Sequence, residues 1–131
     1  MIFGQLSWPC EPKVWGEVER LLRPSLRRSD DELDEVTTQL AHGLAQLWAA
    51  IDGTEMKLAL VTRLDQATRG LRCLIWHLGG HDRHSWLKFQ DEIADWARAE
   101  GCIDMEAYAR PGFLPDIHDW TPHKVIVRKA L

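Results

Sequence analysis

Hydrophobic positions in the first third of the chain follow a helical spacing. Val14, Trp15, Val18, Leu21 and Leu22 fall on one face of an amphipathic helix. Pro12 suits the first turn of this helix, and Pro24 should kink or end it. The run from Ser29 to Glu32 has the form of a capping box, and the apolar positions after it predict a second helix over 30–42. Gly43 is a natural end for that helix.

The pattern then changes to one typical of strands. Residues 44–51 are almost continuously apolar, which predicts a buried strand, and the Asp52-Gly53 turn should lead into a returning strand over 56–64. A second turn and a third strand over 71–77 follow. With a short strand at 1–8, this pattern indicates three consecutive antiparallel strands in the middle of the chain.

The last third predicts a crossover. The strand over 71–77 should end in a Gly79-Gly80 turn, and Ser85 is a plausible N-cap for a helix that runs to residue 100. Residues 102–108 alternate as a half-exposed strand, so the unit from 71 to 108 is a parallel βαβ crossover. A short helical segment over 111–118 and a final strand over 124–129 should complete the chain.

These elements predict an α/β fold with a mixed sheet in a single domain, 1–131. Their order is strand, two helices, three strands, helix, strand, short helix, strand. With 45% hydrophobic residues the chain can bury a core without disulfides. The three cysteines are scattered and indicate a reducing compartment.

Charge and hydropathy narrow the range of partners. The formal net charge is −4, so the chain lacks the basic excess expected of a protein that binds nucleic acid. We interpret one local cluster of arginines as a solvated helix face or a protein contact: Arg20, Arg23, Arg27 and Arg28. No apolar run is long enough to span a membrane, and the N-terminus does not resemble a signal peptide. We therefore expect a cytoplasmic protein without membrane partners.

Four segments carry a resemblance to a known family. They are 44–50 (LAQLWAA) after Gly43, 93–98 (IADWAR) before Gly101, 109–113 (ARPGF), and 125–129 (VIVRK). Together with the order of elements, they make the chain resemble the GNAT superfamily of acetyl-coenzyme-A-dependent N-acetyltransferases. More narrowly, it resembles the small GNAT-like proteins encoded by tailed phages, which would place it in the host cytoplasm or in a virion.

The resemblance implies a site for acetyl-CoA between the strand over 71–77 and the helix after it. In the family, the pantetheine arm pairs with the strand backbone, and the pyrophosphate binds N–H groups at the start of the helix. Carried over to this chain, the cofactor-binding residues are Ile75, Trp76, His77, Leu78, Gly79, Gly80, His81, Arg83, His84 and Ser85. The loop departs from the family pattern because both glycines stand at its beginning and Asp82 adds negative charge where phosphate would bind.

Acetyl transfer to an amine also needs a base and an acid. His77 is the best candidate base, because its unperturbed pKa is near neutrality, although a histidine at the end of a strand is more often a hydrogen-bonded structural residue. Glu106 faces outward on the neighbouring strand, and Tyr108, the single tyrosine, is a candidate acid. His77, His81 and His84 do not have a convincing metal-ligand pattern, so no metal is expected.

Two functional hypotheses follow. The first is an N-acyltransferase that uses acetyl-CoA on an unidentified amine. The second is a catalytically degenerate GNAT fold that serves as a structural or assembly protein of a phage particle, with other subunits or copies of itself as partners. Seven tryptophans bear on this choice, because exposed rings at Trp8, Trp76 and Trp120 would indicate a docking surface.

Overall fold

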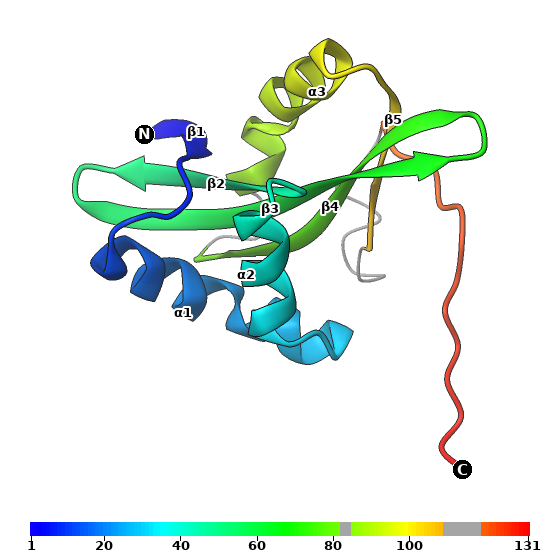
Figure 1. Ribbon diagram of the computed structural model, residues 1–131, viewed down its shortest axis with the longest axis horizontal. Helices are drawn as coiled ribbons and strands as arrows, with labels where there is room; N and C mark the ends of the chain where they lie inside the picture. The colour runs from blue at the N-terminus through cyan, green and yellow to red at the C-terminus, as the bar shows by residue number, and fades with distance from the viewer. Residues whose placement is uncertain (82–84, 109–118) are drawn as a thin grey trace.

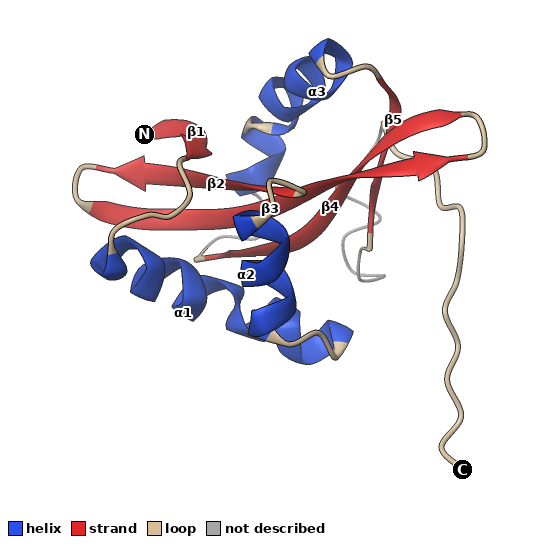
Figure 2. Ribbon diagram, viewed as in Figure 1, coloured by secondary structure: helices blue, strands red, loops and turns tan. Residues whose placement is uncertain are grey.

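A computed structural model, which describes residues 1–81, 85–108 and 119–131, shows a mixed sheet with helices on both faces (Figures 1 and 2). The elements are β1 (Ile2–Leu6), α1 (Pro12–Ser29), α2 (Leu33–Ala41), β2 (Ala45–Asp52), β3 (Glu55–Ala67), β4 (Gly70–Gly80), the short 3-10 helix η1 (Ser85–Lys88), α3 (Gln90–Ala99) and β5 (Cys102–Ala107). The predicted α/β fold class is confirmed.

The sheet has the strand order β1-β2-β3-β4-β5. Strands β1 to β4 pair antiparallel with their neighbours, whereas β5 pairs parallel with β4. The predicted three-strand antiparallel run and the parallel crossover through α3 are therefore both confirmed. Because α3 returns over the sheet face opposite α1 and α2, the sheet forms the middle of three layers (Figure 2).

Each face of the sheet has its own apolar core. Val18 and Leu22 of α1 pack with Val36 of α2 over Val61 and Leu74 of the sheet. On the other face, Ile93 and Ala97 of α3 pack with a second buried set: Trp48, Leu60, Cys73 and Ile75. Among the described residues, none of the helices is long and apolar enough to cross a membrane.

Helix α1 differs from the sequence prediction at its C-terminal end. It continues through Pro24, which is exposed, and ends at Ser29. The capping box predicted there is wrong: the Ser29 hydroxyl donates back to the carbonyl oxygens of Ser25 and Leu26 at 2.9 and 3.3 Å, so it belongs to the end of α1. Asp30 then takes a left-handed conformation at φ 60°, and α2 begins only at Leu33.

The predicted Gly79-Gly80 turn is also wrong, because both glycines are strand residues. β4 extends to Gly80, where Gly79 and Gly80 pair with Ala59 and Leu58 of β3. The glycine at 79 has a steric reason: a Cβ there would overlap the carbonyl oxygen of Leu21 in α1. The missing side chain lets the helix backbone lie directly against the strand.

Two further expectations need correction. Ser85 begins η1, and the residue that caps α3 is Phe89, so Ser85 is not the N-cap of that helix. The final strand predicted over 124–129 is wrong: those residues are exposed and pair with no strand in the part of the chain that the structure describes. The helical segment predicted over 111–118 lies outside the described residues.

The tryptophans mostly serve the core. Trp76 is buried, Trp8 packs edge-on against Trp15 with ring centroids 4.9 Å apart, and Trp120 packs against Trp86 at 5.9 Å. Trp120 Nε1 also donates to Gln90 Oε1 at 3.0 Å. The rings therefore give no support to an aromatic docking surface.

The contact between α1 and β4 predicts a large effect of a single methyl group. Gly79→Ala should lower the free energy of unfolding by about 3 kcal/mol or more, because the helix backbone must move away from the strand. Urea denaturation of the two proteins measures the difference. Gly16→Ala is the matched control: a Cβ at Gly16 meets nothing within 4 Å, so alanine in this helical position should stabilise by about 0.5–1 kcal/mol. Equal stabilities of the Gly79→Ala variant and the wild type would contradict the close approach.

Candidate active site

The candidate site lies where β5 stops pairing with β4. The parallel ladder runs from Leu71 with Cys102 to Ile75 with Ala107 and ends there. β4 continues to Gly80 along β3, so the other edge of its second half has no strand partner among the described residues. An unpaired strand edge presents N–H and C=O groups that can pair with an extended ligand.

A β-bulge in this half of β4 decides which way its side chains point. Val61 and Thr62 of β3 are consecutive, yet they pair with His77 and Ile75, so Trp76 is an extra residue in β4. Trp76 packs in the core under α1 and α2, and His77 lies on the same face because of the bulge. Without the extra residue, strand alternation would turn His77 toward α3.

His77 is held between two groups of the α1–α2 region. Its Nδ1 and the hydroxyl of Ser25 lie 2.9 Å apart and share a hydrogen bond. Its Nε2 lies 3.0 Å from Asp31 Oδ2, but the carboxylate is off the line required for a hydrogen bond. The residue is 1% exposed, so it reaches the surface only through these neighbours.

Burial governs the charge state of His77. Desolvation lowers the pKa of its imidazole below the usual value, and the carboxylate of Asp31 opposes this shift without reversing it. The folded protein therefore holds His77 neutral near pH 7.

Asp31 connects His77 to Trp76 and to the surface. The indole Nε1 of Trp76 donates to Asp31 Oδ2 at 3.2 Å, and the Arg63 guanidinium lies 4.7 Å above the Trp76 ring. Asp65 holds Arg63 by two hydrogen bonds of 2.7 and 3.0 Å. The side chain of Asp31 is 26% exposed while that of His77 is buried, so a solute can reach His77 only through a neighbour such as Asp31.

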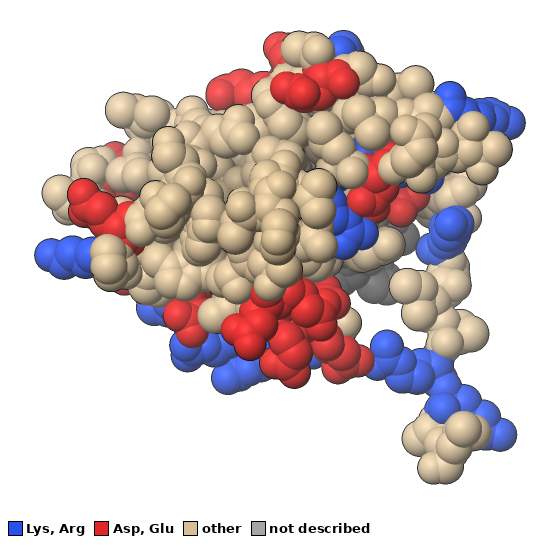
Figure 3. Space-filling view, viewed as in Figure 1, with Lys and Arg blue, Asp and Glu red and all other residues tan. Residues whose placement is uncertain are grey.

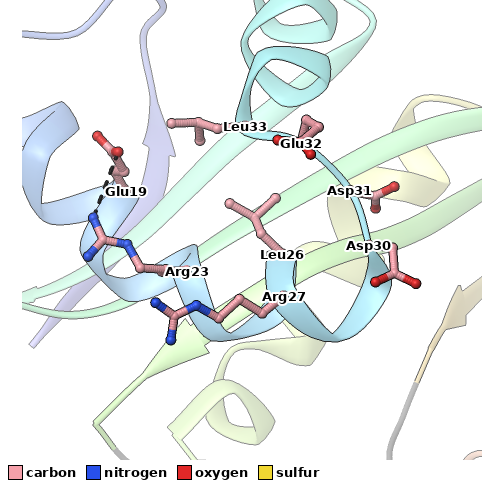
Figure 4. A pocket seen from close by; sticks show the side chains of 8 residues that line it. All are labelled: Glu19, Arg23, Leu26, Arg27, Asp30, Asp31, Glu32 and Leu33. Atoms are coloured by element: carbon pink, nitrogen blue, oxygen red, sulfur yellow. Dashed lines mark ion pairs between the residues drawn. The ribbon is translucent and has the colours of Figure 1, made fainter.

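A pocket of about 440 Å³ opens beside Asp31 (Figure 4). Its lining consists of Glu19, Arg23, Leu26, Arg27, Asp30, Asp31, Glu32 and Leu33. The three acidic residues of the α1–α2 connection stand on one side, and the two arginines of α1 stand on the other. Acidic side chains gather on this face of the molecule (Figure 3), which favours a cationic group.

The predicted catalytic residues are not all brought together. Glu106 is paired with Arg72, whose Nη1 lies 3.4 Å from its Oε2, while Asp104 takes two hydrogen bonds from the same guanidinium. Tyr108 follows the end of β5 and is 65% exposed. The pKa of Arg63 is raised, chiefly by its hydrogen bonds to Asp65, and Tyr108 makes a smaller electrostatic contribution to that shift. Tyr108 therefore interacts with the charge of Arg63.

The predicted cofactor residues divide into two groups. Ile75, Trp76, His77, Leu78, Gly79 and Gly80 all lie in the second half of β4, and five of them are beyond the last pair with β5. His81 follows the strand and is exposed, with its Nε2 3.9 Å from Glu55. Arg83 and His84 lie outside the described residues, as does the side chain of Ser85.

The start of α3 does not favour phosphate. Asp91 and Glu92 stand in its first turn, where they satisfy the positive end of the helix dipole themselves. Of the two contacts that the resemblance implies for coenzyme A, the strand edge of β4 fits an extended pantetheine arm. The helix N-terminus is a poorer match for the pyrophosphate.

Sequence reasoning missed Ser25 and Asp31. They lie 52 and 46 positions before His77, and in the sequence they belong to a proline-interrupted helix end and an apparent capping box. No local pattern links them to a histidine in a strand, because the link depends on the path of α1 across β4.

Several solved structures with this fold are acetyltransferases by name. No protein-family model and no curated protein matches the chain in sequence. The GCN5-related N-acetyltransferase from Ralstonia eutropha is 12% identical with a TM-score of 0.73, over 98% of this chain and 97% of that one. An aminoglycoside acetyltransferase from an uncultured soil metagenomic sample is 11% identical with a TM-score of 0.74, over 99% and 95%.

A third structure is a predicted acetyltransferase from Clostridium acetobutylicum with acetyl-CoA. It is 11% identical to this chain and has a TM-score of 0.66, over 99% and 96% of the two chains. These structural similarities establish the fold of the chain. It has the GNAT fold over its length, with α1 and α2 on one face of the sheet and α3 on the other.

The buried His77 predicts a pH-dependent stability. A histidine whose folded pKa is lowered contributes stability above its unfolded pKa of about 6.5, and this contribution is lost as the pH falls through that value. The free energy of unfolding should therefore decrease from about pH 7 to pH 5, and His77→Gln should flatten that slope. Urea titrations at several pH values measure it. His42→Gln, at the surface, should keep the wild-type slope; an unchanged slope in His77→Gln would contradict the assignment.

Proposed function

We propose that the protein is an acetyl-CoA-dependent N-acetyltransferase acting on a small molecule or peptide that presents a primary amine. The observation that carries the proposal is the edge of β4 from Trp76 to Gly80, beyond the point where β5 leaves it, which has no strand partner among the described residues. In the fold family, this edge is where the pantetheine arm pairs with backbone groups. The acidic pocket beside it supplies a place for the amine.

When bound, acetyl-CoA supplies a thioester carbonyl as the electrophile. The acceptor ammonium would first lose one proton, to Asp31 or to water, and its nitrogen could then bond to the carbonyl carbon as the carbon–sulfur bond breaks. The second proton lost by the nitrogen would be balanced by protonation of the departing thiolate. Asp31 is the group that contacts the ammonium, since its side chain lines the pocket and is partly exposed. The indole N–H of Trp76 positions the carboxylate by its hydrogen bond, and neutral His77 lies 3.0 Å from the same oxygen, so any effect of His77 on the ammonium passes through Asp31.

The two other predicted catalytic residues take lesser roles in this proposal. Tyr108 follows β5 and interacts with the charge of Arg63, and its hydroxyl is the candidate acid for the departing thiolate. Glu106 is neutralised by Arg72 and supports the β4–β5 pair. Arg23 and Arg27, across the pocket from Asp31, favour an acceptor that also carries an anionic or strongly polar group.

Cofactor binding is the first test. Acetyl-CoA should raise the melting temperature, by about 10 °C when its concentration is about 100 times Kd, because it binds the folded chain only. His81→Glu, which adds negative charge beside the end of β4, should weaken this shift, and His42→Glu should not. Gly80→Glu is a poorer probe, because a Cβ at Gly80 would lie 2.7 Å from the Lys57 carbonyl oxygen and disturb the strand. No shift at millimolar acetyl-CoA would exclude catalysis as the main role.

Turnover tests the role of Asp31. Thiol release from acetyl-CoA, measured with a panel of primary amines that includes a diamine, a lysine peptide and an aminoglycoside, should fall about 100-fold in Asp31→Asn. Asp30→Asn lines the same pocket but does not touch His77, so it should change KM more than kcat. Equal losses in the two variants would show that the pocket acts only through its net charge.

A second candidate function rests on the acidic first turn of α3. Asp91 and Glu92 oppose a pyrophosphate, as expected of a GNAT fold that has lost catalysis and serves as a structural or assembly protein of a phage particle. This alternative expects no melting shift with acetyl-CoA and a fixed stoichiometry of the protein in purified particles. Its absence from particles would count against it.

A further inference from the structure

Three side chains of the candidate site form a serine–histidine–aspartate set, and the transfer described above leaves its serine without a role. Ser25 comes from α1, His77 from β4, and Asp31 from the connection between α1 and α2. Ser25 Oγ lies 2.9 Å from Nδ1 of the imidazole, and Asp31 Oδ2 lies 3.0 Å from Nε2. A hydroxyl, an imidazole and a carboxylate in this order can turn a weak hydroxyl into a nucleophile.

The two oxygens decide which ring nitrogen of His77 carries the proton. A carboxylate 3.0 Å from Nε2 is attracted by an N–H and repelled by a lone pair, so the neutral ring is protonated on Nε2. Nδ1 then has the lone pair and accepts the hydrogen bond from the Ser25 hydroxyl. Burial keeps the pKa of His77 below its usual value, so this base form is present near pH 7. Asp31 is off the line for a hydrogen bond in this state, but it attracts the ring more strongly once Nδ1 has taken a proton.

The direction of the Ser25 hydroxyl is unusual for a serine in a helix. Such a hydroxyl commonly donates to a carbonyl of the preceding turn, as Ser29 does to the Ser25 carbonyl oxygen at 2.9 Å. The Ser25 hydroxyl is directed across to the strand instead. The contact of the Leu21 backbone with Gly79, one helical turn earlier, holds α1 at the height where this bond forms. The hydroxyl therefore belongs to the site rather than to the end of the helix.

Ser25 is within reach of a reactant, whereas its base is not. The serine is partly exposed, and the imidazole beneath it is 1% exposed, so water is kept from the base. The next two residues of α1, Leu26 and Arg27, line the pocket of about 440 Å³ (Figure 4). His77 lies in the half of β4 that has no second strand partner among the described residues. Backbone N–H groups of such an edge can stabilise the oxyanion of a tetrahedral intermediate.

We propose that Ser25 is a nucleophile that takes an acyl group from an activated ester or thioester, with His77 as its general base. As Ser25 Oγ bonds to the carbonyl carbon, its proton passes to Nδ1, and Asp31 stabilises the imidazolium. The bond from that carbon to the leaving oxygen or sulfur then breaks, and the leaving group takes the proton from Nδ1. Water or an amine next attacks the acyl ester and gives one proton to Nδ1, which returns it to Oγ as the ester bond breaks.

This activity goes beyond the proposed N-acetyltransferase, because it needs no coenzyme A. With water as the acceptor it is the hydrolysis of an ester or a thioester. With an amine as the acceptor it is an acyl transfer in two steps, through an acyl group on Ser25.

Acyl trapping on the full chain tests the nucleophile. The probe is p-nitrophenyl acetate, the reaction is quenched in acid, and peptide mapping by mass spectrometry locates the acetyl group. The wild type should release a burst of p-nitrophenol and carry the acetyl group on Ser25. Ser25→Ala should lose both, and His77→Gln should slow the burst about 100-fold. Ser29→Ala, one helical turn away, is the matched control and should keep the wild-type burst. A wild type without acetyl-Ser25, or equal labelling of Ser25 after unfolding in urea, would overturn the proposal.

Ser25→Cys separates a nucleophile from a structural hydrogen bond. A thiol beside the same imidazole should restore the burst that Ser25→Ala loses, and the acetyl group should then be on the cysteine. A Ser25→Cys protein with the circular dichroism of the wild type and no acetyl group at position 25 would contradict the proposal. The melting shift with acetyl-CoA is independent of this result. Acetyl-Ser25 without that shift would leave this site standing and exclude the N-acetyltransferase, whereas a shift without acetyl-Ser25 would do the reverse.

Discussion

The close approach of α1 to β4 is the constraint on which the rest of the site depends. Side chains ordinarily separate the backbone of a helix from the backbone of a sheet. Here the absence of a Cβ at Gly79 lets the Leu21 carbonyl lie directly against the strand. That contact fixes the height and direction of α1. Four residues farther along the helix, Ser25 then meets His77, and the connection after the helix brings Asp31 to the same imidazole.

The bulge at Trp76 is the second feature that brings His77 to the candidate site. An extra residue in β4 turns His77 onto the face that α1 covers, so two successive side chains of the strand, Trp76 and His77, reach one carboxylate. The indole N–H holds Asp31 by a hydrogen bond, and the neutral imidazole lies against the carboxylate without adding charge. The carboxylate is thereby presented to the pocket by groups that themselves stay out of water.

The first half of β4 holds β5 in the sheet, and its second half presents backbone groups to a ligand. In the first half, Arg72 ties β4 to Asp104 and Glu106 of β5, so the strands stay together. In the second half the strands separate, and the backbone of β4 becomes available to a ligand. The outer edge of β5 likewise has no strand partner among the residues that the structure describes.

The sequence by itself determined the order of elements, since their spacing follows from which faces are apolar: the antiparallel run β2–β4 and the parallel crossover to β5 were predictable. It also located the half of β4 that carries the candidate site, through His77 and its neighbours. Only the tertiary structure decided that Gly79 and Gly80 are strand rather than turn, that α1 passes through Pro24, and that residues 124–129 form no strand with the described part of the chain. These outcomes depend on contacts between segments that are distant in the sequence, such as Leu21 with Gly79, and the local spacing of residues does not predict such contacts. Ser25 and Asp31 joined the site for the same reason, because a helix path set by one missing methyl group brought them to His77.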